Sequence, residues 1–451
     1  MTTTLVAEIG STTTVVNAFT GLDGKDPKFI AQGLAPTSVE VGDVLIGLNQ
    51  ALAQLKQSLG EEPIYDNFFA TSSAAGGLKM TVHGLVYDMT VKAAREAALG
   101  AGAVLRYATA GKISEHDLEQ IRSIRPNIIL LAGGVDYGDK TVVLENAKTL
   151  SQGIQKMQLK VPVIYAGNIA AAEEVKSIFE GTGTEVHVVE NVYPSIDQLN
   201  VEPTRKVIQQ VFEGHITQAP GMARIKEMVQ GRIMPTPGAV MQAAKCMYEE
   251  MGDLLVVDVG GATTDVHSVT EGSEEINRIL LSPEPLAKRT VEGDLGVYVN
   301  GTQIMDVIGR GDLEARYGND YRALLKPVPE SIEEIALSRE LTAKAVEVAL
   351  RRHAGKLINI FGPVGRTTLA QGKDLTRVKW IIGTGGALTR LPGGMDILGA
   401  ITSDLQKELM PRSGAALLLD NYYILSSLGV LCSAHREGAF YLMRESMGIE
   451  S

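Results

Sequence analysis

The stretch that decides the fold reads LVAEIGSTTTVV over residues 5–16. A second stretch, LVVDVGGATTDV over residues 255–266, repeats it at a constant offset of 250 residues. Six positions are identical, and an acid stands at the same place in both copies, as Glu8 and Asp258. Each copy has apolar β-forming residues on both sides of small and hydroxylic ones, which predicts a strand, a tight turn and a second strand. One such hairpin at the start of each half indicates a duplicated α/β domain.

The rest of the chain alternates predicted strands with predicted helices. Continuous apolar strands over 127–132, 161–166 and 186–190 are separated by helical patterns, which favours a parallel sheet covered on both faces. We therefore expect an α/β protein with two halves. The first half, 1–250, contains these additional α/β units and a helical connection, and the second half is 251–451. Long helices are also predicted over residues 331–357 and 422–443.

The composition of the chain argues against several classes of protein. The 451 residues are 45% hydrophobic and 21% charged, which is enough apolar material for several packed cores. The net charge of −11 argues against a nucleic-acid partner, and no apolar run approaches the roughly 20 residues of a membrane span. The N-terminus lacks the basic and apolar regions of a signal peptide. Two cysteines, Cys246 and Cys432, cannot form a disulfide framework. We expect a cytoplasmic protein with no membrane partner.

Both hairpin turns have the composition of a phosphate-binding loop. A turn of glycine and short hydroxylic residues exposes backbone N–H groups and hydroxyls, and no large side chain blocks a phosphate. Glu8 and Asp258 stand at the strand ends, where they could hold a hydrated Mg²⁺ ion. The alternative for each turn alone is an ordinary solvated β-turn. The predicted phosphate contacts are Gly10, Ser11, Thr12, Thr13, Gly260, Gly261, Thr263 and Thr264.

A third glycine-rich turn follows a predicted strand over residues 378–382. Glycine allows close approach of a flat or anionic ligand, and a helix that starts after the turn favours negative charge. The alternative is a tight packing turn without a ligand. The predicted ligand contacts here are Gly383, Thr384, Gly385 and Gly386.

The order of these motifs resembles that of the actin-like ATPase superfamily, which includes DnaK-type chaperones, sugar kinases and acetate kinase. The resemblance implies duplicated ribonuclease-H-like domains around a cleft that binds ATP or ADP with Mg²⁺. It identifies the two hairpins as the phosphate motifs, residues 383–387 as the adenosine motif and the region of Gly429 as the second connecting motif. Glu8 departs from the usual aspartate. The first connecting motif is left open between Asp136 and Glu190.

Four longer segments, residues 71–80, 93–98, 131–136 and 289–296, resemble the GlmL/MutL family. These are accessory proteins of adenosylcobalamin-dependent glutamate mutase and related aminomutases, unrelated to the mismatch-repair protein of similar name. The resemblance implies a reactivating chaperone and weak ATPase that uses its nucleotide state to release damaged cobalamin from a mutase. The implied partners are the mutase subunits.

Three other functions are weighed against this one. A small-molecule kinase of the same superfamily needs a general base, for which Asp136 and Asp265 are candidates. A dehydratase activator would need Cys246 and Cys432 to ligate an iron–sulfur cluster in a dimer. A filament protein would need surfaces for self-association. The sequence does not fix the oligomeric state, and a homodimer stays open.

Overall fold

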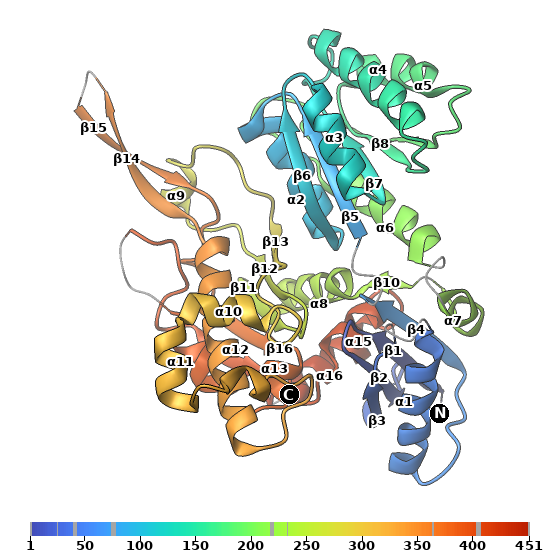
Figure 1. Cartoon of the computed structure of the whole chain (residues 1–451), viewed down its shortest axis with the longest axis vertical. Coiled ribbons are helices and arrows are strands. Elements are labelled where there is room, and N and C mark those ends of the chain that lie inside the picture. Colours follow the sequence, from blue (N-terminus) through green and yellow to red (C-terminus); the bar gives the residue numbers. More distant parts are fainter. Residues whose placement is uncertain are drawn as a thin grey trace. The chain divides into compact units, whose positions relative to one another are not determined.

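The chain folds into two compact units. Unit 1 comprises residues 1–74, 224–281 and 286–451. Unit 2 comprises residues 75–223 and the short segment 282–285. Figure 1 shows the computed structural model, in which residues 75–223 of unit 2 run from blue to yellow-green. The predicted division into halves at residue 250 stays a prediction. The structure describes residues 2–24, 26–38, 43–73, 78–216, 221–231, 233–362, 365–402 and 407–449.

Unit 1 contains two five-stranded sheets of mixed direction. The first has the order β10-β4-β1-β2-β3, in which β1, β2 and β3 are antiparallel while β4 and β10 run parallel to β1. Helix α1 (Val44–Leu59) packs on β3 and β2. The strands are β1 (Thr3–Ile9), β2 (Thr13–Thr20), β3 (Lys28–Pro36), β4 (Asn67–Ser72) and β10 (Met234–Pro235).

The second sheet repeats the first strand for strand. Its order is β13-β12-β11-β16-β17, again with three antiparallel strands followed by two parallel ones. The predicted duplication of an α/β domain is therefore confirmed. The strands are β11 (Leu254–Val259), β12 (Thr264–Val269), β13 (Ala287–Glu292), β16 (Trp380–Thr384) and β17 (Ala416–Leu419).

Helices α8 and α15 pack between the two sheets. One core cluster joins Val6 of β1, Val256 of β11, Met247 of α8 and Leu428 of α15. On the other face of the second sheet, Val257 packs in a cluster with residues of α12. The helices, with one 3₁₀ turn, are α7 (Met222–Met228), α8 (Thr236–Met251), α9 (Glu274–Asn277), α10 (Gly301–Ile308), α11 (Arg310–Tyr317), η3 (Tyr321–Leu324), α12 (Ile332–His353), α13 (Gly386–Thr389), α14 (Gly394–Gly399), α15 (Leu425–Leu431) and α16 (Arg436–Ser446).

Unit 2 is a parallel sheet of five strands in the order β6-β5-β7-β8-β9, with helices between the strands. The predicted parallel sheet is confirmed. Its strands are β5 (Leu78–Gly84), β6 (Ala103–Ala110), β7 (Ile128–Leu131), β8 (Val163–Tyr165) and β9 (Val186–Val188). Its helical elements are η1 (Tyr87–Val91), α2 (Lys92–Gly100), α3 (Glu115–Ile124), α4 (Thr141–Lys156), η2 (Ile169–Ala171), α5 (Ala172–Phe179) and α6 (Glu202–Ile216).

Two predicted helices differ from the structure. The helix expected over 331–357 ends at His353, and the chain continues into a two-stranded hairpin of β14 (Lys356–Gly362) and β15 (Gly365–Gln371). Ala354 already has an extended backbone, and Gly355 packs tightly against the carbonyl oxygen of Gln371. Among the residues that the structure describes, no helix combines the length and apolar character needed to cross a membrane.

The helix expected over 422–443 is instead two helices, α15 and α16. The break falls just before α16, at His435, whose φ of −133° turns the chain. A Cβ at Gly438 would lie 2.4 Å from the Leu22 carbonyl oxygen, so close approach to the loop after β2 fixes the position of α16.

Candidate functional site

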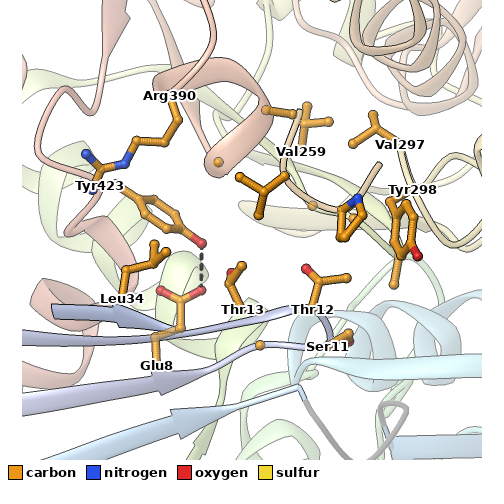
Figure 2. Close-up of a pocket in the computed structure, with 18 of the residues that line it drawn as sticks. Glu8, Ser11, Thr12, Thr13, Leu34, Val259, Val297, Tyr298, Arg390 and Tyr423 are labelled. Atoms are coloured by element: carbon orange, nitrogen blue, oxygen red, sulfur yellow. Dashed lines mark hydrogen bonds between the residues drawn. The ribbon is translucent and has the colours of Figure 1, made fainter. Parts of the chain in front are cut away.

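A cavity of about 590 Å³ lies within unit 1, lined by both hairpin turns. The first hairpin contributes residues 10–13 and the second contributes residues 258–263. Figure 2 shows Thr12 and Thr13 directed toward the open centre, with Glu8 and Tyr423 at one side. Lys326 and Arg390 also line the cavity and bring positive charge to it. A space of this size suits a small organic ligand with anionic groups.

The two turns are closed by the same backbone hydrogen bond. The Gly10 amide donates to the Thr13 carbonyl oxygen at 2.9 Å, and the Gly260 amide donates to the Thr263 carbonyl oxygen at the same distance. They also lie against each other, because a Cβ at Gly261 would come within 2.8 Å of the Thr12 methyl carbon. The predicted pair of facing hairpins is therefore present, and a ligand between them meets both turns.

The second turn is braced by the segment after β13. The Val297 amide donates to the Gly260 carbonyl oxygen, and the amides of Tyr298 and Val299 both donate to that of Gly261. A Cβ at Gly296 would lie 2.1 Å from the Ala262 carbonyl carbon, so glycine is required for this contact. The glycine-rich acidic turn 293–296 thus supports the second hairpin.

The Asp258 carboxylate lines the cavity and accepts no hydrogen bond from the described residues. Asp258 lies at the end of β11. Burial raises its pKa well above the usual range, and the nearby charges of Asp265 and Glu8 raise it further. Arg289 opposes this effect, but its Nε donates to Asp265 at 2.9 Å. A cation beside Asp258 would relieve this excess of negative charge.

Glu8 has the opposite surroundings. Its side chain is 6% exposed, and both carboxylate oxygens accept hydrogen bonds. Ser426 of α15 donates to Oε2, and the Tyr423 hydroxyl donates to Oε1 at 3.2 Å (Figure 2). Burial raises the Glu8 pKa, while these two hydrogen bonds oppose the rise. Glu8 is therefore held by hydroxyls of the protein.

The third predicted segment contributes less surface to the cavity than its composition indicates. Gly386 lines the cavity at the start of α13, but Gly383 packs among leucine side chains. Thr384 donates to buried Asp420 at 2.9 Å. Gly385 has a φ of +88°, and a Cβ there would lie 2.6 Å from the Asp258 carboxylate. The backbone of this turn at Gly385 therefore packs directly against the Asp258 side chain.

The remaining predicted positions are distributed as follows. Gly10, Ser11, Thr12, Thr13, Gly260, Gly261 and Thr263 line the cavity. Thr264 is buried and donates to the Leu295 carbonyl oxygen at 2.7 Å. Gly429 is a packing position, since a Cβ there would lie 1.9 Å from the Ala239 carbonyl oxygen of α8. Asp136 and Glu190 belong to unit 2 and do not line the cavity. Of the segment 71–80, residues 74–77 lie outside the described residues.

Sequence reasoning missed four residues near Glu8 and Asp258: Arg390, Asp420, Tyr423 and Ser426. Asp420 accepts hydrogen bonds from Thr384, from Ser446 and from the first amides of α15, so it joins the third segment to that helix. The Arg390 guanidinium lies 5.8 Å from the ring centre of Tyr423. The one signal for these residues was an aspartate directly after the apolar run 415–419.

Within the described ranges, no group of three or more His, Cys, Asp or Glu side chains is arranged to hold a metal ion. This does not conflict with a Mg²⁺ site, because Mg²⁺ commonly takes only one or two carboxylates and completes its shell with water and phosphate oxygens. The unpaired carboxylate of Asp258 fits that donor set.

The chain matches the family described as "MutL protein" over residues 4–447. "Protein MutL" of Clostridium tetanomorphum is 37% identical over 462 residues, covering 98% of each chain. This chain belongs to the MutL family. The family predicted from four segments of sequence is therefore confirmed.

Several solved structures are similar to the MutL-family chain at low identity. Nucleotide-free acetone carboxylase is 13% identical, over 94% of this chain and 69% of that one, with a TM-score of 0.39. The nucleotide-free diol dehydratase-reactivating factor is 10% identical, over 97% and 100%, with a TM-score of 0.36. The duplicated sheets that share one cavity give this chain the predicted actin-like ATPase fold.

Proposed function

We propose that this protein is a nucleotide-driven chaperone that reactivates an adenosylcobalamin-dependent mutase, either glutamate mutase or a related aminomutase. Membership of the MutL family supports the class of client. The observation that carries the proposal is the cavity between two repeated turns, with the unpaired carboxylate of Asp258 at its side. Both cysteines are free thiols, which fits a reducing cytoplasm.

ATP or ADP would place its phosphates between the two turns. Backbone N–H groups of both turns and the hydroxyls of Thr12 and Thr13 would bind the phosphate oxygens. Lys326 and Arg390 would add positive charge near the ligand. Gly386 and the residues after it would lie against the nucleoside. Bound Mg²⁺ would neutralise phosphate charge, with Asp258 holding the ion and Glu8 adding its negative charge nearby.

Reactivation follows from differential binding. A mutase that has lost its adenosyl group retains inactive cobalamin in a closed site, and release requires the open state. A chaperone that binds the open state of the mutase more tightly than the closed state shifts the mutase toward the open state. The size of this shift is set by the difference between the chaperone's affinities for the two states. Nucleotide exchange can change that difference because domain closure around a ligand moves the surfaces on either side.

A small-molecule kinase stays the alternative function. It requires a general base beside the hydroxyl that is phosphorylated. Asp265 lines the cavity, but its Oδ1 accepts the hydrogen bond from Arg289 Nε and its Oδ2 accepts one from Thr263. Both oxygens are thus engaged, which disfavours this residue as the base. Phosphorylation of a metabolite without any mutase present would favour the kinase.

The proposal is tested by cobalamin release from glutamate mutase loaded with hydroxocobalamin. Mutase, this protein and Mg-ATP are incubated, and free cobalamin is measured by absorbance after gel filtration. We expect release to require both protein and nucleotide, and Asp258→Asn to slow it by about tenfold or more, equivalent to about 1.4 kcal/mol. The matched control is Asp306→Asn on the exposed side of α10. Release that needs no nucleotide, or that proceeds equally with Asp258→Asn, contradicts the proposal.

A further inference from the structure

The exposed large apolar side chains of unit 2 all lie at one edge of its sheet. Each of them falls in a segment that follows the carboxyl end of a strand: residues 85–91 after β5, 132–140 after β7, 166–171 after β8 and 189–201 after β9. Because β5 to β9 are parallel, these carboxyl ends meet at the same edge. Among the described residues of unit 2 they are Val86, Tyr87, Tyr137, Ile169 and Ile196, and we call this surface the loop face.

Buried hydrogen bonds hold the loop face in shape. Asn168 is fully buried, accepts from the amides of Tyr137 and Ala170 through Oδ1, and donates to Gly138 through Nδ2. Asn191 donates to Asp136 Oδ1 at 2.9 Å, and the same oxygen accepts from the Ile169 amide. Three of the four segments are therefore cross-linked. A surface that is ordered in advance loses little conformational entropy when it binds a partner.

Two residues of the loop face have left-handed backbone. Tyr137 has a φ of +62° and its side chain is 83% exposed. Asp197, next to Ile196, has a φ of +60°. Left-handed backbone is unfavourable for residues other than glycine, and such strain concentrates at functional sites. The hydrogen bond from the Tyr137 amide to buried Asn168 holds this backbone conformation and leaves the ring in solvent.

The loop face is acidic as well as apolar. Four exposed acids lie in its segments, while the one exposed base there, Lys140, forms an ion pair with Glu174. Arg95 of α2 reaches the edge and donates to the Tyr87 hydroxyl. The acids therefore outnumber the bases that are free to bind a partner. Exposed apolar side chains surrounded by acidic ones favour a partner surface that is basic around an apolar centre. The four acids are Asp88, Asp139, Glu190 and Asp197.

We propose that the loop face is the docking surface for the client mutase, which would present apolar side chains ringed by Lys and Arg. This inference rests on the proposed function and adds the surface by which it operates. The apolar side chains are 48–83% exposed, as on a protein-docking patch and unlike the enclosed lining of a small-molecule pocket.

The test compares two triple variants in binding to purified glutamate mutase with Mg-ADP, by isothermal titration calorimetry. The loop-face variant is Tyr137→Asn, Ile169→Ser and Ile196→Ser, where asparagine tolerates the left-handed backbone. The control removes three apolar side chains of unit 1 that are 79–88% exposed, by Ile64→Ser, Ile332→Ser and Phe361→Ser. We expect the Kd to rise by about tenfold or more in the first variant and by less than about twofold in the control. Both should keep the melting shift that Mg-ADP gives the wild type.

A second variant tests the charge argument. Asp88→Lys with Glu190→Lys should weaken binding and reduce its dependence on salt, because it removes attraction to the basic partner. Wild-type binding that survives unchanged in both loop-face variants overturns the docking surface and leaves the proposed function standing. A wild type that binds no mutase in any nucleotide state overturns the proposed function, and the docking surface with it. If sedimentation shows a wild-type dimer that the triple variant loses, the occupant is a second copy and the client assignment is wrong.

Discussion

The two hairpin turns are closed by the same backbone hydrogen bond, but their carboxylates, Glu8 and Asp258, have different surroundings. Both turns close with an amide-to-carbonyl hydrogen bond of 2.9 Å. Glu8 in the first hairpin accepts hydrogen bonds from Ser426 and Tyr423 and is almost fully buried. Asp258 in the second has no donor among the described residues and faces the cavity beside Asp265. The repeat conserves the loop that would bind phosphate, while neighbouring residues determine which acid is free to bind a cation.

The largest expected effect comes from removing that free acid. Asp258→Asn should abolish the stabilisation by Mg-ADP, which amounts to about 3 kcal/mol at a hundred times the Kd. Glu8→Gln should retain part of it, because Glu8 is already held by hydroxyls of the protein. Differential scanning fluorimetry with and without EDTA measures both. An equal loss in the two variants would remove the proposed difference between the hairpins.

The matched glycines at the start of each turn test how tightly the turns are packed. A Cβ at Gly10 would lie 2.6 Å from the Thr13 carbonyl oxygen, whereas a Cβ at Gly260 would lie 3.3 Å from that of Thr263. Gly10→Ala should therefore lower the free energy of unfolding by about 2 kcal/mol and Gly260→Ala by less than about 1 kcal/mol. Urea unfolding without nucleotide measures the difference, and equal losses would contradict it.

The next effect concerns the hydroxyl that holds Glu8. Ser426→Ala removes a donor to a buried carboxylate and should cost about 1.5 kcal/mol of stability. Tyr423→Phe should cost less, because its hydrogen bond to Glu8 is longer, at 3.2 Å. A double-mutant cycle with Glu8→Gln isolates the interaction. If the loss from Ser426→Ala is the same in the Glu8→Gln background, the serine does not act through Glu8.

The smallest effect is a dependence of stability on pH. The pKa values of Glu8 and Asp258 are both raised in the folded state. Between the usual carboxyl range and these raised values, the folded state binds more protons than the unfolded state, so its stability falls as pH rises. Urea unfolding of the wild type and of Glu8→Gln/Asp258→Asn, between about pH 4 and pH 8, should give a slope that the double variant reduces. Parallel slopes would contradict the raised pKa values.

The sequence was sufficient for features that are local or repeated. Residues 5–16 and 255–266 predict both hairpins, because the alternation of β-forming residues and small turn residues is contained in twelve positions. The acids at Glu8 and Asp258 follow from the same alignment. The family follows from segments long enough to match as wholes, such as 289–296.

The sequence was insufficient where tertiary contacts decide the outcome. Ser426 and Tyr423 reach Glu8 across more than 400 positions, and no local pattern marks that contact. The third glycine segment was predicted to bind ligand, yet Gly383 and Thr384 pack inside, because Leu419 and Asp420 lie behind them. The end of α12 and the position of α16 depend on close approaches of Gly355 and Gly438 to other segments.

We propose that nucleotide binds between the two turns through a metal ion at Asp258. A crystal structure with Mn²⁺ and ADP tests it most directly, because Mn²⁺ replaces Mg²⁺ and gives an anomalous signal. We predict a single strong anomalous peak beside the Asp258 carboxylate, with the ADP phosphates between residues 10–13 and 260–263. ADP elsewhere in the molecule, or Mn²⁺ remote from Asp258, would contradict the claim.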